Sequence, residues 1–150
     1  MEYIISACLC GINCKYSGKN NYNEKAAQLF NKGLALPVCP EAFGGLCTPR
    51  ASAEIVNGDG KDVLKGIAKV ISKDGIDCTD AFIKGAEKTV EIAKKLNIQK
   101  AILKANSPSC GYGQIYDGSF SGQKIKGNGV TAQLLLRNDI EVYNELYKIY

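Results

Sequence analysis

The 150-residue sequence contains no histidine, and this absence narrows the chemistry open to its other residues. It excludes zinc sites with histidine ligands, the His-Glu-x-x-His metalloproteases and nucleophiles activated by a histidine base. A cysteine-rich site in this chain must therefore rely on thiolate ligands. Thiolates select zinc, Cu(I) or iron–sulfur clusters.

Two further scarcities bear on partners and location. Only two arginines, Arg50 and Arg137, accompany the scattered lysines, and the net charge is +4. This balance does not predict a nucleic-acid-binding surface. No apolar run reaches the length of a membrane span, and the first residues lack the pattern of a signal peptide. We therefore expect a cytoplasmic protein that binds neither nucleic acid nor membrane.

Cysteine, by contrast, is abundant, with seven residues in the chain. Because thiols stay reduced in the cytoplasm, clustered cysteines there more often bind metal or carry out chemistry than form disulfides. The hydrophobic fraction of 45% lets a single domain, residues 1–150, bury a core without disulfides.

Hydrophobic periodicity predicts alternating strands and helices. Asn23 and Thr79 are candidate N-caps, and Gly33 is a candidate helix-terminating glycine. This order of elements predicts an α/β fold, a three-layer Rossmann-like or flavodoxin-like domain with a mostly parallel sheet. The expected strands cover residues 3–6, 34–38, 100–103 and 140–143, and the expected helices cover residues 24–32, 80–96 and 129–137, with a last helical turn at 145–150.

The segment between the two halves departs from this alternation. Residues 40–50 are rich in glycine and proline, which predicts a loop. Residues 51–75 are expected to form a small β-hairpin insertion, in which residues 54–56 pair with residues 67–71.

Four cysteines follow expected strands. Cys8 and Cys14 come after the first, Cys39 after the second and Cys110 after the strand at 100–103. Loops at the carboxyl ends of parallel strands meet in one crevice, where ligands bind. A free cysteine can also be simply a small buried hydrophobe. Four cysteines at strand exits favour a shared site, although their spacing matches neither a zinc ribbon nor a ferredoxin.

Other residues near these cysteines admit two interpretations. Glu41 is a possible general acid or base, or a solvated loop carboxylate. Ser107 and Ser109 can donate hydrogen bonds to a cluster or substrate, or simply form a turn. Cys10 and Cys47 lie near the candidate site in sequence without an argument of their own.

Three remaining features are weaker. Cys78 precedes an expected helix and is more typical of packing. Asp117, in Tyr-Asp-Gly, is typical of a turn, although it lies close enough to Cys110 in sequence to line a pocket. Residues 127–130 could present backbone N–H groups to an anion at a helix start, but they lack the lysine of a P-loop.

Five motifs occur in order along nearly the whole chain: Ser6-Ala-Cys-Leu-Cys-Gly…Cys14-Lys-Tyr-Ser-Gly18, Cys39-Pro-Glu41…Gly45-Leu-Cys-Thr-Pro-Arg50, Leu103-Lys-Ala-Asn-Ser-Pro-Ser-Cys-Gly111, Ile115-Tyr-Asp-Gly-Ser-Phe120 and Gly129-Val-Thr-Ala132. With these motifs the sequence resembles the bacterial domain-of-unknown-function family that contains the iron–sulfur-dependent thiouracil desulfidase.

The resemblance implies a cofactor, a substrate class and roles for individual residues. A [4Fe–4S] cluster is held by three cysteines, which correspond to Cys8, Cys39 and Cys110, with Cys14 as a rival. The open iron acts as a Lewis acid on the C=S group of a small thiolated compound such as 2-thiouracil, and water attacks without net redox chemistry. Glu41 corresponds to the base, and Ser107 to a contact of the substrate or sulfur.

The sequence departs from the family at three positions. Cys10 replaces an aliphatic residue, Cys47 a proline and Ser17 an acidic residue. Either extra cysteine could supply a fourth thiolate and close the open iron. There are two alternatives to a desulfidase. One is a non-catalytic domain with a Cys₄ zinc site or a closed cluster, and the other is a metal-free sulfur-handling protein with one reactive cysteine. In aerobic preparations an open cluster is easily lost or replaced by zinc.

Overall fold

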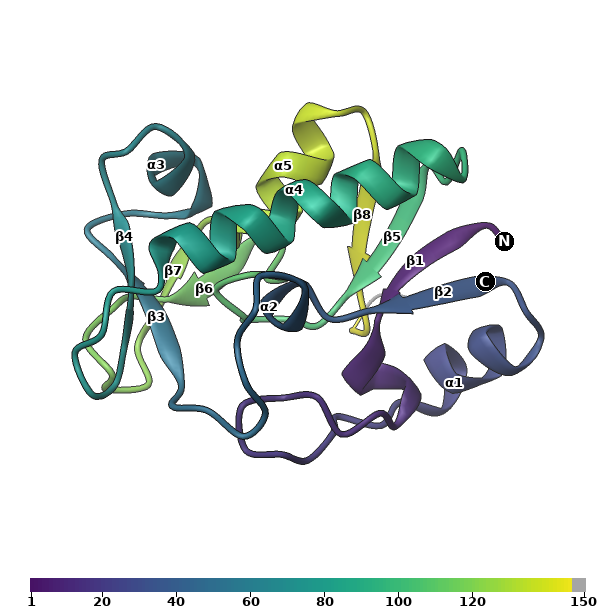
Figure 1. Ribbon diagram of the computed structural model, residues 1–150, viewed down its shortest axis with the longest axis horizontal. Helices are drawn as coiled ribbons and strands as arrows, with labels where there is room; N and C mark the ends of the chain where they lie inside the picture. The colour runs from purple at the N-terminus through teal and green to yellow at the C-terminus, as the bar shows by residue number, and fades with distance from the viewer. Residues whose placement is uncertain (147–150) are drawn as a thin grey trace.

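The central element is a parallel sheet, seen in a computed structural model that describes residues 1–146. Four strands, β1 (Tyr3–Ser6), β2 (Ala35–Val38), β5 (Lys100–Leu103) and β8 (Glu141–Asn144), form it in the order β2-β1-β5-β8 (Figure 1). Numbered among themselves, the strands run 2-1-3-4, which is the beginning of a flavodoxin-type sheet. The expected α/β fold with a mostly parallel sheet is confirmed. From β1 the chain first adds β2 on one side of the sheet and then β5 and β8 on the other, so the strand order reverses between β1 and β5.

Helices cover both faces of this sheet. α1 (Glu24–Asn31) lies on one face, and α4 (Thr79–Lys95) and α5 (Val130–Arg137) lie on the other (Figure 1). Because successive strand residues point to opposite faces, Ile4 packs with α4 and α5 while Ile5 packs with α1. The sheet is therefore the middle of three layers, as expected from the sequence.

The helix ends agree with the sequence at one helix and differ at another. The Asn23 side chain accepts a hydrogen bond from the Ala26 amide, and Gly33 follows α1 with a φ of 71°. Thr79, expected as an N-cap, is instead the first residue of α4, and its amide donates to the Asp77 carboxylate. The helical turn expected at residues 145–150 lies mostly outside the described residues.

The expected hairpin insertion is present, with an additional helix inside it. β3 (Ala53–Val56) and β4 (Lys69–Ser72) pair antiparallel, as predicted. Between them lies α3 (Gly60–Leu64), a helix that the sequence did not predict. Asp59 and Asp62 form a reciprocal capping box at its start, which stabilises even this short helix.

Four further short elements were not anticipated. A 3₁₀ turn, η1 (Ala7–Cys10), follows β1, and α2 (Pro40–Phe43) occupies part of the expected loop at 40–50. β6 (Gln114–Tyr116) and β7 (Lys124–Lys126) form a second antiparallel hairpin. One-turn helices and strands of three residues carry too little periodicity to be recognised in a sequence.

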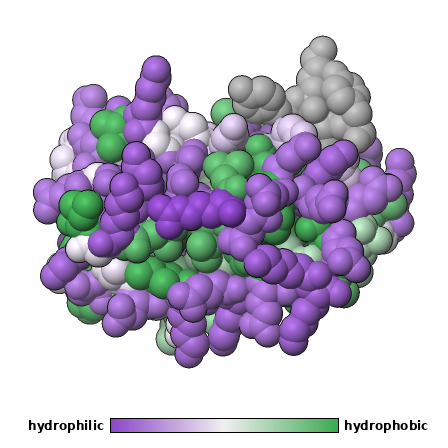
Figure 2. Space-filling view, turned by 90° about the horizontal axis from the view of Figure 1, so that it is seen from above, coloured by the Kyte–Doolittle hydropathy of each residue, from purple (hydrophilic) through white to green (hydrophobic). Residues whose placement is uncertain are grey.

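The face of the molecule seen in Figure 2 is largely polar. Hydrophilic side chains cover most of the face shown in Figure 2, and hydrophobic side chains show between them near its middle. Among residues 1–146, no helix combines the length and apolar character required to cross a membrane.

Candidate metal centre

A cavity of about 500 Å³ opens where the carboxyl ends of β1, β2 and β5 come together. This is the crevice that the reversal of strand order creates. Loops from distant parts of the chain contribute to its wall. The lining side chains that carry chemistry are Cys8, Cys14, Lys15, Tyr16, Cys39, Glu41, Arg50, Glu54, Lys104, Asn106, Ser107, Cys110 and Tyr116.

The four cysteines at strand exits all line this cavity. The Cys14 thiol hydrogen-bonds with those of Cys8 and Cys39. The Sγ atom of Cys39 also lies 3.7 Å from the carbonyl oxygen of Cys14, where its S–H can donate a weak hydrogen bond. Cys110 receives a hydrogen bond from the buried hydroxyl of Ser6. The structure thus brings together the thiols that the sequence analysis grouped.

Backbone contacts fix the loop that carries Cys39. This cysteine is the N-cap of α2, and Pro40 begins the helix with the φ that a first helical turn requires. α2 lies directly against α4 because Gly85 has no side chain: a Cβ atom there would lie 1.9 Å from the Pro40 carbonyl oxygen. Close packing of two backbones therefore sets the position of Cys39.

A different contact fixes the loop that carries Cys110. The amides of Val130 and Thr131, at the start of α5, donate to the carbonyls of Pro108 and Ser109. A Cβ atom at Gly129 would lie 2.4 Å from the Ser109 carbonyl oxygen, so glycine permits this approach. Within residues 127–130, the amides of Gly127, Gly129 and Val130 all donate to backbone carbonyls and are not available to an anion, so the structure does not support an anion site there.

The thiols differ in their ease of ionisation. Hydrogen bonding from Cys14 lowers the pKa of Cys39 to about 6 and that of Cys8 to about 7. The same hydrogen bonds raise the pKa of Cys14, which keeps its proton. Burial raises the pKa of Cys110. The single S–H of Cys14 donates to one sulfur at a time, so one thiolate is available near neutral pH. A bound metal would deprotonate a coordinating thiol in any case.

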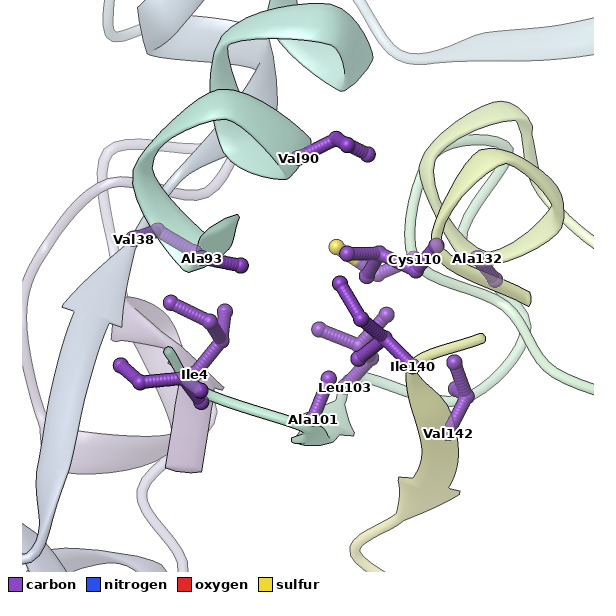
Figure 3. Packing of buried hydrophobic residues seen from close by; sticks show 12 residues of the cluster. Ile4, Val38, Val90, Ala93, Ala101, Leu103, Cys110, Ala132, Ile140 and Val142 are labelled. Carbon is purple, nitrogen blue, oxygen red and sulfur yellow. The ribbon is translucent and has the colours of Figure 1, made fainter. Parts of the chain in front are cut away.

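Cys110 also belongs to the hydrophobic core. Its exposed fraction is 6%, and Figure 3 shows it in the cluster with Leu103, Ala132 and Ile140. Cys110 therefore also fits the alternative interpretation of a free cysteine, a small hydrophobic residue packed in the core. It remains the one thiol of the cavity contributed by the loop after β5.

The donor set fits an iron–sulfur cluster. Such clusters are held by thiolates, and each of these four side chains borders one cavity. Within residues 1–146, no three Cys, Asp or Glu side chains are placed to hold a single metal ion. Thiolates around a cluster bind different iron atoms, so they need not converge on one point.

The other cysteines do not line the cavity. Cys10 packs beside α1, with its Sγ atom 4.0 Å from the Ala26 carbonyl oxygen, and burial raises its pKa to about 11. Cys47 is exposed, and Cys78 packs against the cluster around Phe82. The geometry therefore gives no support to Cys10 or Cys47 as a fourth ligand.

Two acidic residues receive different assignments. Asp117 accepts a hydrogen bond from the Ser119 amide at 2.9 Å, which confirms its role in a turn, and it does not line the cavity. Glu41 does line the cavity, with 19% of its side chain exposed, and pairs with Arg50 at 3.1 Å. Burial raises the pKa of Glu41, against the opposing effect of the guanidinium.

Ser107 combines both of its interpretations. Its Oγ atom accepts hydrogen bonds from the amides of Ser109 at 3.1 Å and Cys110 at 3.0 Å, which builds the turn. These bonds use the oxygen as acceptor and leave its O–H as a donor for a group in the cavity. Ser109 is buried and its hydroxyl hydrogen-bonds with that of Thr131, away from the cavity lining.

Several lining residues were not singled out in the sequence. Arg50 stood in a motif without a role, and Glu54 lay inside an expected strand. Lys104 follows β5 and pairs with Glu145 at 3.0 Å. Its position directly after a buried strand, like that of the cysteines, was the available signal. Lys15 hydrogen-bonds to Asn21 within the loop after η1, where the sequence shows no periodicity.

Comparisons with known proteins agree with this geometry. The family model described as 2-thiouracil desulfurase matches residues 3–146. The uncharacterized protein YbbK of Bacillus subtilis (strain 168) is 48% identical over 142 residues, which cover 95% of this chain and 94% of that protein. The solved structure of the [4Fe–4S]-dependent thiouracil desulfidase TudS has a TM-score of 0.83 and 38% identity, covering 96% of this chain and 90% of that one.

Proposed function

The chain belongs to the 2-thiouracil desulfurase family, and on this premise we propose that it is a [4Fe–4S]-dependent non-redox desulfidase of a small thiolated compound such as 2-thiouracil. One observation carries the proposal: four thiols, a partly buried carboxylate and a serine hydroxyl line the same cavity. The similarity to a thiouracil desulfidase that depends on such a cluster supports it.

We assign the cluster ligands to three loops. Cys8, Cys39 and Cys110 come from the carboxyl ends of β1, β2 and β5, so that each strand contributes one thiolate. Cys14 is the alternative ligand, and its thiol already contacts two of the others. When bound, the cluster supplies a Lewis-acidic iron that polarises a C=S bond.

Glu41 is the proposed base. It takes a proton from a water molecule whose oxygen bonds to the carbon of the C=S group. The C–S bond then breaks and a C=O group forms, and the sulfur leaves as hydrogen sulfide with the two protons of the water, one of which Glu41 returns. No electron is gained or lost in this exchange of sulfur for oxygen, so the protein needs no reductant.

Ser107 is the proposed contact of the substrate. Its oxygen is fixed by two amides, so its O–H has few directions in which to point. A fixed donor favours one orientation of the reacting group. The substrate is expected to be a small molecule, since the site is a cavity of about 500 Å³ rather than a flat surface.

The test is reconstitution without oxygen. The chain is purified anaerobically and loaded with iron and sulfide. Iron, sulfide and zinc per chain are measured together with sulfide release from 2-thiouracil. We expect about four irons per chain and release of sulfide. Zinc in place of iron would favour a Cys₄ zinc domain, and a folded chain without iron or sulfide would contradict the proposal.

Single substitutions assign the residues. Cys8→Ala, Cys39→Ala and Cys110→Ala are each expected to abolish cluster loading, whereas Cys78→Ala, outside the cavity, is the matched control with full loading. Glu41→Gln should keep the iron and lose activity by roughly 10²- to 10⁴-fold, the range of general acid–base catalysis. Normal iron content in Cys110→Ala would exclude that thiol as a ligand.

A further inference from the structure

Arg50 is the most highly connected side chain of the cavity wall. Its Nε donates to Glu41 Oε1 at 3.1 Å, and its Nη2 donates to the Cys14 carbonyl at 3.1 Å. Its Nη1 donates to the Cys47 carbonyl at 3.1 Å and to Thr48 Oγ1 at 3.0 Å. Four of the five N–H groups of the guanidinium are therefore engaged.

These contacts join three separate segments of the site. One carries Cys14, the second is α2 with Glu41, and the third is the loop that carries Arg50 itself. The Arg50 backbone amide also donates to the Tyr16 carbonyl at 2.8 Å, which joins the loop of Arg50 to the loop that carries Cys14. A side chain with 10% exposure and this set of partners holds the loops in one arrangement.

The contact with Glu41 leaves one carboxylate oxygen unused. Arg50 binds Oε1, and among the described residues every buried side-chain oxygen has a hydrogen-bond partner. Because no partner of Oε2 occurs within residues 1–146, that oxygen is not fully buried, and the cavity is the space that Glu41 lines. The guanidinium thus holds the carboxylate by one oxygen and leaves the other for water.

We propose that Arg50 is a positioning residue of the desulfidase reaction, which orients the free oxygen of Glu41 and holds the Cys14 loop against α2. This inference rests on the proposed function, because Arg50 acts through the proposed base. Its planar fork reaches four acceptors at once, which a lysine ammonium on a flexible stem does not reproduce.

The test compares Arg50→Met and Arg50→Lys with Arg137→Met. Arg137 is the other arginine of the chain, is exposed and does not line the cavity. Iron and sulfide per chain are measured for each reconstituted variant, and kcat and KM for 2-thiouracil are then expressed per cluster. We expect Arg50→Met to keep its iron, lose about 10- to 100-fold in kcat and change KM less than threefold. Arg50→Lys should recover only part of the loss.

A purely structural role gives a different result. Turnover per cluster within threefold of the unchanged protein, or a loss fully explained by lower iron content, would overturn the positioning role. If Arg50→Met fails to fold, the same criteria apply to Arg50→Lys, which keeps the charge. Absence of turnover in the unchanged protein and in Arg137→Met would instead defeat the proposed function, and the role of Arg50 with it.

Discussion

The Glu41 carboxylate shows how one residue is subject to opposing influences. Burial at the cavity edge disfavours its charged form, and the Arg50 guanidinium favours it. Burial is the larger influence, so the pKa of Glu41 lies above the ordinary value for a glutamate. A base whose pKa is raised toward neutrality accepts a proton more readily once it is ionised.

This shift predicts the pH dependence of the reaction. The base must be ionised, so activity falls when the pH drops through the pKa of Glu41. Because that pKa is raised, the loss should begin at a higher pH than an ordinary carboxyl group would cause. The measurement is kcat/KM against pH for the loaded protein, with iron content checked at each pH. An acid limb at or below the usual range of glutamate would contradict the prediction.

The cysteines also differ in their surroundings, and these differences set how readily each thiol ionises. Cys8 and Cys39 ionise readily because Cys14 hydrogen-bonds to them, while Cys10 packs beside α1 with its pKa raised by burial. Sequence neighbours such as Cys8 and Cys10 thus have different surroundings, because one faces the cavity and the other faces a helix.

At the scale of elements, the site depends on how α2 packs against α4. Both Cys39 and Glu41 are placed by a helix of four residues, which has no stability of its own. Its support is the contact between the Pro40 carbonyl and the Gly85 backbone. The sheet directs the loops toward the cavity, but the contact between α2 and α4 sets the positions of Cys39 and Glu41.

Gly85→Ala tests this dependence. Alanine would ordinarily stabilise a helix interior by about 1 kcal/mol over glycine. Here its Cβ atom would lie 1.9 Å from the Pro40 carbonyl oxygen, so α2 must move. We expect the free energy of unfolding to fall by about 1–3 kcal/mol and iron per chain to decrease.

The neighbouring exposed residue on α4 provides the control for this variant. Lys84→Ala should leave both urea stability and iron content close to those of the unchanged protein, because Lys84 faces solvent. Stabilisation by Gly85→Ala with full iron loading would show that the contact between α2 and α4 has no importance for the site.

At the scale of the whole molecule, the helices α4 and α5 contribute side chains to two hydrophobic clusters. One cluster lies over the sheet, and the other joins the β3–β4 hairpin to α4 and α5 through Phe82, Ala86 and Val130. Leu134 packs against both clusters. We therefore propose that the hairpin insertion and the sheet belong to one domain.

A single domain predicts one cooperative unfolding transition. Urea unfolding of the metal-free protein is followed by far-ultraviolet circular dichroism and by tyrosine fluorescence, since the chain has eight tyrosines and no tryptophan. The two signals should change with the same midpoint. Separate midpoints would show that the hairpin insertion unfolds independently of the sheet.

The sequence by itself determined the four parallel strands and the cysteines that follow them. The strands β1, β2 and β5 contain short apolar runs, and loops after parallel strands must meet at one edge of a sheet. The convergence of Cys8, Cys39 and Cys110 on one cavity follows from these two facts. The motifs of the family also lie in these loops, so the family could be recognised before the structure.

Only the tertiary structure decided the contacts within the cavity wall. The pairing of Arg50 with Glu41, the use of the α5 amides by the Cys110 loop and the placement of Cys10 away from the cavity depend on loop conformation. Loops and helices of four residues have no periodic pattern, and neighbouring backbone fixes them. Local sequence therefore predicts which groups meet, and packing decides how they face one another.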